Sequence, residues 1–153
     1  MNVYWLLPFL EGWAYEPTYK TNFKIGADKE SEVFRHENTK GYFFGAIVTS
    51  DNPDMELIVN IDGKILKGSA TSAYVVQATI LQPITFTLIR YNTAGKYTVM
   101  YSPPKPLPFR FRIEGKLKAV GADTTVDEFR ALCVLVTDPE AFIKSLKSIT
   151  EAK

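Results

Sequence analysis

Short stretches of alternating apolar and polar residues fill the chain between Thr21 and Thr137, and clusters of turn-forming residues separate them. The clearest turn signals lie at residues 51–54, 62–63 and 92–95. A period of two places successive side chains on opposite faces of a strand, and closely spaced strands of this kind are typical of antiparallel sandwiches and barrels. The pattern therefore predicts an all-β fold.

A series of short strands is expected, with two recognisable hairpins among them. Asp62-Gly63 is a favoured two-residue turn because both positions accept positive φ, and residues 92–95 join the next two apolar runs in a similar way. The predicted strands cover residues 22–25, 31–36, 41–50, 55–61, 64–67, 73–78, 84–91, 96–102, 109–120 and 128–137.

The prolines of residues 103–108 fix φ and remove backbone donors, which predicts a stiff extended connection between two sheets. A proline-rich ligand for another protein is the alternative. The strand that follows alternates cleanly, so Phe109, Phe111 and Ile113 are expected to point inward. The predicted core also includes Phe44, Ile58, Phe86, Leu88, Val99 and Leu135.

The hydrophobic period changes near the end of the chain, where one short helix is predicted over residues 139–149. Asp138 suits the cap, and Pro139 suits the first helical position. Phe142, Leu146 and Ile149 then form an apolar stripe at helical spacing. We expect this stripe to pack on the sandwich, with a partner protein as the alternative.

Residues 1–20 are predicted to form an aromatic N-terminal arm, and residues 21–153 a single sandwich domain that includes the C-terminal helix. The arm is too apolar for a disordered tail, and its prolines argue against a helix. It packs along its own domain or reaches onto a neighbour, and an ordinary first strand is the remaining alternative. The interface residues predicted on this arm are Tyr4, Trp5, Phe9, Trp13, Tyr15 and Tyr19.

Partners of two kinds are disfavoured by the sequence. The opening residues have no basic residue before the apolar stretch and no small-residue cleavage site after it, so neither a signal peptide nor a membrane anchor is expected. The 18 basic and 17 acidic residues nearly balance. Nucleic acid is therefore an improbable partner, and no membrane association is expected.

Side chains that commonly carry out catalysis are scarce in this chain, which has one histidine and one cysteine. Cys133 lies in an apolar run and is interpreted as a small buried hydrophobic residue. His36 has no second histidine to complete a metal pair. We therefore expect a protein that is not an enzyme, with no cofactor, no resident metal and no catalytic residue.

Two weaker signals were weighed against ordinary structural explanations. Asp51 and Asp54 supply oxygens that suit calcium, but their tetrad is also favourable turn material, so a turn is preferred and calcium is left open. Basic residues at alternate positions of one strand are interpreted as part of a solvated face of mixed charge. A patch that binds an acidic partner or nucleic acid is the alternative. The basic residues are Arg110, Arg112, Lys116 and Lys118.

The order of strands and turns between residues 41 and 120 resembles that of small jelly-roll structural proteins of virus particles. The similar features are Ser50-Asp51-Asn52-Pro53, Ile61-Asp62-Gly63, the pair Arg90-Tyr91 and residues 97–101, and the prolines before Phe109. The viruses concerned are especially tailed bacteriophages and archaeal viruses. The resemblance implies an antiparallel, jelly-roll-like β-sandwich.

For function, the resemblance implies a non-catalytic structural protein of the virion: a capsid decoration, turret, tail or adsorption component. Such a protein would bind copies of itself, a major capsid protein or a tail protein. The alternative is a module that binds carbohydrate or another ligand, with Trp13, Tyr15 and Tyr42 stacking on sugar rings. A cytoplasmic or secreted location is the alternative to the virion.

Overall fold

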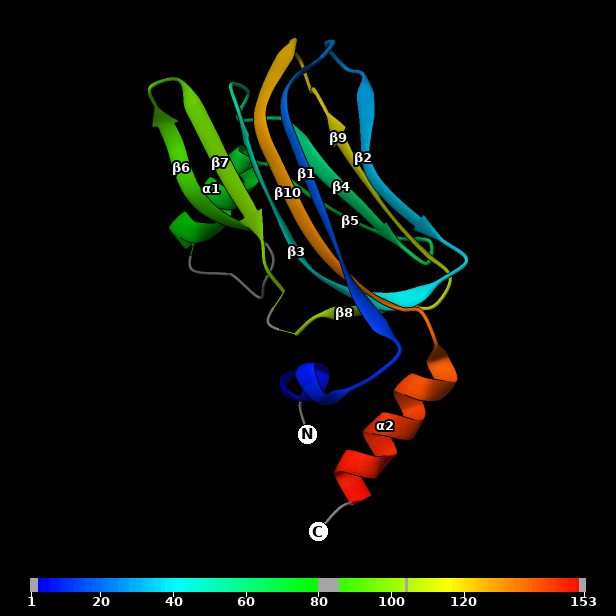
Figure 1. The fold of residues 1–153 in the computed structure, drawn as a ribbon. Helices are drawn as coiled ribbons and strands as arrows, with labels where there is room; N and C mark the ends of the chain where they lie inside the picture. Colours follow the sequence, from blue (N-terminus) through cyan, green and yellow to red (C-terminus); the bar gives the residue numbers. More distant parts are fainter. Residues whose placement is uncertain (1–2, 80–85, 104, 152–153) are drawn as a thin grey trace.

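Two antiparallel sheets pack face to face in this protein (Figure 1). The structure is a computed structural model that describes residues 3–79, 86–103 and 105–151. The predicted all-β antiparallel sandwich with a short C-terminal helix is confirmed.

Each sheet combines a hairpin of consecutive strands with strands that are distant in the sequence. Sheet A has the order β1-β10-β3-β7-β6, with β8 also paired to β3, and sheet B has the order β2-β9-β4-β5. The strands of sheet A are β1 (Trp13–Ile25), β3 (Lys40–Ser50), β6 (Phe86–Thr93), β7 (Lys96–Tyr101), β8 (Leu107–Phe109) and β10 (Thr124–Val136). Those of sheet B are β2 (Glu30–Glu37), β4 (Glu56–Ile61), β5 (Lys64–Gly68) and β9 (Arg112–Lys118).

The main hydrophobic core lies between the two sheets. Phe34, Phe43 and Phe129 stack there, with ring centroids about 6 Å apart (5.9 Å and 6.1 Å from Phe34). Gly115 makes room for this stack, because a Cβ at that position would collide with the Phe34 ring. Alternate residues of β4 enter the same core.

The predicted core residues have different outcomes. Val99 and Ile113 are buried as expected. Other members are only partly buried, and these are Phe44, Ile58, Leu88 and Leu135. The side chain of Phe86 lies outside the described part of the structure.

The two predicted hairpins are confirmed. Asp62 and Gly63 join β4 to β5 with φ values of 51° and 90°, as the two-residue turn requires. Ala94 and Gly95, with φ values of 54° and 72°, join β6 to β7, and these strands pair antiparallel.

The inward orientation expected for Phe111 is wrong, because this side chain is 69% exposed. The chain bends at residues 110–111, where it leaves sheet A after β8 and enters sheet B at β9. The Asp62 carboxylate holds this bend by accepting hydrogen bonds from the backbone N–H groups of Arg110 (2.8 Å), Phe111 (2.8 Å) and Arg112 (3.0 Å). The bend interrupts the alternation, so Phe109 and Ile113 are buried and Phe111 points to solvent.

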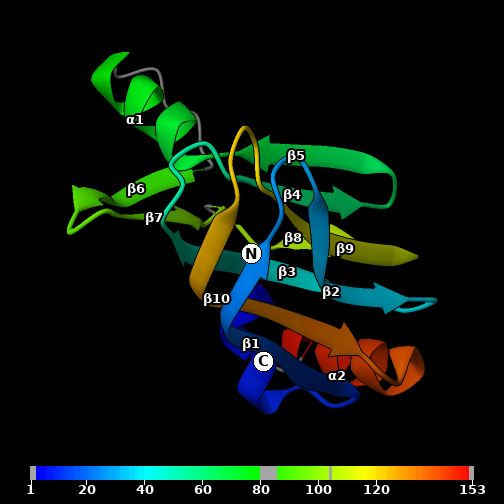
Figure 2. The same cartoon turned by 90° about the horizontal axis from the view of Figure 1, so that it is seen from above.

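The strand expected at residues 73–78 is also wrong, because this segment belongs to helix α1 (Ala70–Thr79). Ser69 and Ser72 cap the helix reciprocally: each backbone N–H donates to the other residue's hydroxyl, at 2.8 Å and 3.1 Å. The helix lies beside β6, far from the C-terminal helix (Figure 2). Tyr74 stacks there on Tyr91, with ring centroids 4.8 Å apart.

The two ends of the chain lie at the same end of the sandwich (Figure 1). The N-terminal segment forms a 3-10 helix, η1 (Val3–Phe9), followed by β1, which pairs along its length with β10. The predicted boundary at residue 20 therefore falls inside a strand, and residues 13–20 match the alternative of an ordinary first strand. The predicted C-terminal helix is α2 (Pro139–Glu151). None of the described helices is long and apolar enough to span a membrane.

Candidate functional site

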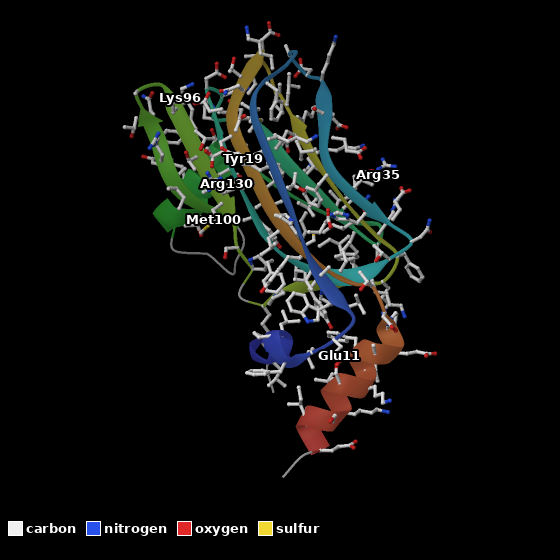
Figure 3. All side chains as sticks on the ribbon, in the orientation of Figure 1. Glu11, Tyr19, Arg35, Lys96, Met100 and Arg130 are labelled. Carbon is white, nitrogen blue, oxygen red and sulfur yellow. The ribbon has the colours of Figure 1, made fainter. Side chains whose placement is uncertain are left out.

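The outer face of sheet A carries a continuous row of side chains across five strands. Cross-strand pairing aligns Tyr19 with Arg130, Arg130 with Ile47, Ile47 with Met100, and Met100 with Thr87. Directly paired residues share a face of the sheet. The residues adjacent to this row in β10 and β7 face the core, so the row faces outward. Figure 3 labels Tyr19, Arg130 and Met100 on this side, and Arg35 on the other sheet.

A second row lies next to the first, formed by Pro17, Leu132 and Gly45. Together the two rows give a surface that we name the open half. Neither η1 nor α2 is packed on it in the described structure. It is defined by Pro17, Tyr19, Ile47, Met100, Arg130 and Leu132.

Arg130 is held in place at the centre of the open half. Its guanidinium carbon lies 4.9 Å from the centre of the Tyr19 ring, and its Nε is ion-paired with Glu128. A cation over an aromatic face is attracted by the ring quadrupole. Ring and carboxylate therefore orient this side chain before any ligand arrives, which lowers the entropic cost of using it in binding.

Two shallow depressions in the open half both border β10. One has a volume of ≈ 290 Å³ and extends over β3 and β7, and the other, of ≈ 410 Å³, lies beside Pro17 and Tyr19. Gly45 forms part of the floor of the first depression, next to an irregularity in the β10–β3 pairing. Its φ of +140° and the close approach of the Tyr101 carbonyl both exclude a Cβ. The surface is apolar and open, without a deep cavity.

The remainder of this sheet face, which we name the covered half, is closed by η1 and α2. Leu7, Leu10, Val134 and Phe142 form a second buried cluster there. Trp13, Leu146 and Ile149 pack against the cluster. The expectation that the apolar stripe of the C-terminal helix packs on its own sandwich is confirmed.

Polar contacts fix the two covering segments. The Trp13 indole N–H donates to the Leu10 carbonyl at 2.9 Å. The Glu11 N–H donates to the Ser145 hydroxyl at 3.0 Å, which links the N-terminal segment to α2. Asp138 caps α2 by accepting from the Ala141 N–H at 3.1 Å.

The six interface residues predicted from the sequence are divided between these regions. Tyr15 and Tyr19 are 57% and 61% exposed, whereas Trp13 belongs to the covered half and Phe9 is exposed on η1. Tyr4 and Trp5 lie in η1, and their side chains are outside the described part. The sequence analysis missed five of the six members of the open half. Pro17 lies on β1 beside the predicted residues, and the other four come from three other strands: Ile47, Met100, Arg130 and Leu132.

The two groups considered for chemistry, Cys133 and His36, are buried and half-buried. Burial raises the pKa of the Cys133 thiol to about 12, with a further contribution from Glu16, so it remains protonated at neutral pH. Burial lowers the pKa of His36, and Glu16 acts in the opposite direction. Within the described residues, no three histidine, cysteine or acidic side chains are grouped to hold a metal ion.

The tetrad at residues 51–54 forms a turn tied to the rest of the sandwich. Asp51 accepts from the Thr125 N–H at 2.9 Å, and the Asn52 amide donates to Thr124 at 2.9 Å and to the Val120 carbonyl at 3.1 Å. Asn52 also accepts from the Asp54 N–H at 2.9 Å. These contacts support the structural interpretation of the tetrad.

The basic strand β9 lies on a surface with acidic neighbours. Arg35 of β2 pairs with Glu32, Glu37 and Glu114, at 2.9, 2.9 and 2.5 Å. Lys116 lies 3.4 Å from the carboxylate of Glu114 on the same strand and 3.8 Å from that of Glu30 on β2. Arg112, Lys116 and Lys118 of β9 therefore lie on the mixed solvated face that the sequence favours, whereas Arg110 lies in the bend before β9 and is not on that face.

No protein-family model and no curated protein matches this chain. Among solved structures, a crystal structure of FLHE matches with a TM-score of 0.40 and 4% identity, over 82% of this chain and 98% of that one.

The predicted role as a virion structural protein is corrected by this result. The structural match is to FLHE, and nothing in the comparisons identifies a virus protein. The earlier resemblance consisted of turn and strand order, which unrelated sandwiches share. At a TM-score of 0.40, the match also transfers no function from FLHE to this chain.

Proposed function

We propose that this chain is a non-enzymatic binding protein whose open half docks onto another protein. The observation that carries the proposal is the row from Tyr19 to Met100, which places an aromatic ring, a preoriented arginine and two aliphatic side chains on one uncovered sheet face. Tyrosine, methionine and arginine are enriched at protein interfaces, and arginine and tyrosine are frequent hot spots.

Charge on the open half defines the chemistry of the partner. Arg130 is exposed, and Arg90 faces the same side because it pairs with Thr98, one row away. Glu128 lies on the same face one row from Arg130, and its carboxylate is already paired with Arg130. We therefore propose a partner surface that is apolar at its centre and carries carboxylates facing the two arginines.

A protein partner suits this surface better than a sugar or a substrate. Trp13 and Tyr15 meet edge to face, with ring centroids 4.7 Å apart and planes at 88°, so they present no common stacking plane. Tyr42 is half-buried and lies nearer α2. The depressions of the open half are shallow and apolar, which suits protruding side chains of a partner.

Site-specific cross-linking tests the proposal with a matched pair of positions. A photo-reactive phenylalanine analogue replaces Tyr19 in one variant and Tyr74 in another, because these tyrosines are similarly exposed (61% and 52%) on different surfaces. Both proteins are irradiated in an extract of the source cells. We expect one protein to be captured from position 19 and not from position 74.

Arg130→Ala in the position-19 variant should reduce the capture several-fold, whereas Lys67→Ala on sheet B should leave it unchanged. Capture of a second copy of this chain would identify a homo-oligomer, and sedimentation of the purified protein would then show the same association. Equal capture from positions 19 and 74, or capture insensitive to Arg130→Ala, would refute the proposal.

A further inference from the structure

A further cavity lies at the end of the sandwich near the chain termini, between α2 and the β3–β8 pair. It is a groove of ≈ 340 Å³, which we name the α2 groove. Gly41 shapes its floor: a Cβ at this position would lie 2.6 Å from Cζ of Phe109, so only glycine lets that ring pass under β3. The volume falls at the small end of known ligand sites.

The walls of the α2 groove are mostly apolar. Tyr42 and Phe109 contribute from the sheet, and Phe142, Ile143 and Leu146 contribute from the helix. Ile143 is 51% exposed although it is an isoleucine of a helix that otherwise buries its apolar stripe. An apolar chain lying in the groove would cover this residue and gain free energy in proportion to the area removed from water.

Two cations stand at the rim of the groove. Lys40 begins β3, Arg110 lies in the bend after β8, and both residues line the groove and are exposed. In the described structure, neither has an ion-pair partner within 4.0 Å. Both positive charges are therefore available to a ligand at the edge of an apolar trough.

The neighbouring carboxylates are already engaged by the backbone. Asp62 accepts three backbone hydrogen bonds from the bend, and Asp138 caps α2. The Arg110 charge favours the ionised form of Asp62, although in the described structure the guanidinium and this carboxylate form no ion pair within 4.0 Å. Lys40 and Arg110 themselves both line the groove and are exposed.

We propose that the α2 groove binds a free aliphatic carboxylate, with its hydrocarbon chain against Tyr42, Phe142 and Ile143 and its carboxylate paired with Lys40 and Arg110. The match is one of charge and polarity: an apolar trough with two cations at its rim is complementary to a chain with a single anionic end. One small groove fits a single chain. This site lies away from the open half and does not depend on the proposed protein partner.

Titration with decanoate, below the concentration at which it forms micelles, tests the site in the full chain. Amide chemical shifts measured by NMR should move saturably for residues of α2, the start of β3 and the bend at Arg110. Arg110→Gln and Lys40→Gln should each weaken decanoate binding by about ten-fold, the size expected for one charge-assisted hydrogen bond. Ile143→Glu should abolish binding, because it places an anion at the lip.

Three controls make the experiment decisive. Arg130→Gln, in the open half, should leave the decanoate affinity unchanged. Uncharged 1-decanol should bind the parent protein and the Arg110→Gln variant equally, which separates the apolar contribution from the ionic one. Thermal unfolding of each variant should match the parent, because Lys40, Arg110 and Ile143 are exposed.

The proposal is overturned if decanoate gives no saturable shifts, if its shifts scatter over both sheets, or if the affinity is unchanged in both rim variants. Binding to anionic phospholipid vesicles without binding of decanoate would instead assign this end of the protein to a membrane surface. That result would also overturn the proposal.

Discussion

The two halves of the outer face of sheet A differ in what lies on them. At the end near the chain termini, η1 and α2 cover Val134 of β10, and Phe142 of α2 is buried against it. A few residues further along the same strands, Tyr19 and Arg130 face solvent. Strand β10 contributes to both regions, so one strand supplies an internal packing surface and an exposed one. The difference shows that hydrophobicity of a strand alone does not identify an interface.

The two segments that cover one half, η1 and α2, explain why the two halves have different roles in stability and binding. The covered half buries its apolar side chains within the chain and contributes to folding stability. The open half leaves aliphatic and aromatic side chains in contact with water, where they contribute less to stability and remain available for binding. Substitutions in the two halves should therefore separate stability from binding.

The largest expected effect is in the covered half, at Phe142. Phe142→Ala removes a buried ring and leaves a cavity under α2, so we expect a loss of about 3–5 kcal/mol in the free energy of unfolding. Ile143→Ala, one residue along the same helix and half-exposed, should change it by less than about 0.5 kcal/mol. Urea denaturation measures both, and similar losses would show that α2 is not packed as described.

A smaller effect is expected at Gly45, which lies within the open half but supports its shape. Gly45→Ala places a Cβ against the Tyr101 carbonyl at a φ that disfavours side chains, so it should cost about 1–3 kcal/mol. Gly26→Ala is the control, because its added Cβ would meet only the flexible Lys29 side chain. Equal stabilities of the two variants in thermal unfolding would contradict the strained backbone at residue 45.

A substitution on the exposed part of the open half should change stability little. Tyr19→Ala removes a ring that is mostly in water, so a loss below about 1 kcal/mol is expected. The same variant should lose its protein partner. A loss comparable to that of Phe142→Ala in urea denaturation would mean that the ring is part of the core and not a binding group.

The smallest expected effect is a pH dependence of stability that arises from His36, which lies between the sheets. His36 has a pKa below 6.5 because of its burial, with Glu16 opposing, so the folded state binds its proton less readily than the unfolded state. The stability that neutral His36 contributes is present above about pH 6.5 and falls as the pH drops through this value toward the lower folded-state pKa. The urea midpoint should therefore be slightly lower at pH 5.5 than at pH 7.5, and His36→Gln should reduce this difference.

Much of the fold could be predicted from local patterns. The turn at Asp62-Gly63 and the cap at Asp138-Pro139 are determined by residues adjacent in the sequence, and both occur where they were expected. Phe111 could not be placed in this way. Its exposure depends on Asp62, which is distant in the sequence and whose carboxylate turns the chain from one sheet to the other.

Helix α1 was missed for a related reason. Its residues Tyr74 and Val75 are β-formers by composition, and the reciprocal capping by Ser69 and Ser72 is a weaker signal than an acidic capping box. The open half was missed for a different reason: strand pairing alone brings Tyr19, Arg130 and Met100 into one row. Of that row, only Tyr19 stood out as an aromatic residue in the sequence.

Oxidative footprinting of Tyr19 and Tyr74 tests the division between the open half and the rest of the surface most directly. The protein is exposed to hydroxyl radicals first in purified, dilute form and then in the extract in which its partner is present. The two tyrosines should be labelled at comparable rates when the protein is alone, because their exposed fractions are similar. We expect Tyr19 and Met100 to become protected in the extract while Tyr74 stays reactive. Unchanged labelling of Tyr19, or equal protection of Tyr19 and Tyr74, would contradict the assignment of the open half as the binding surface.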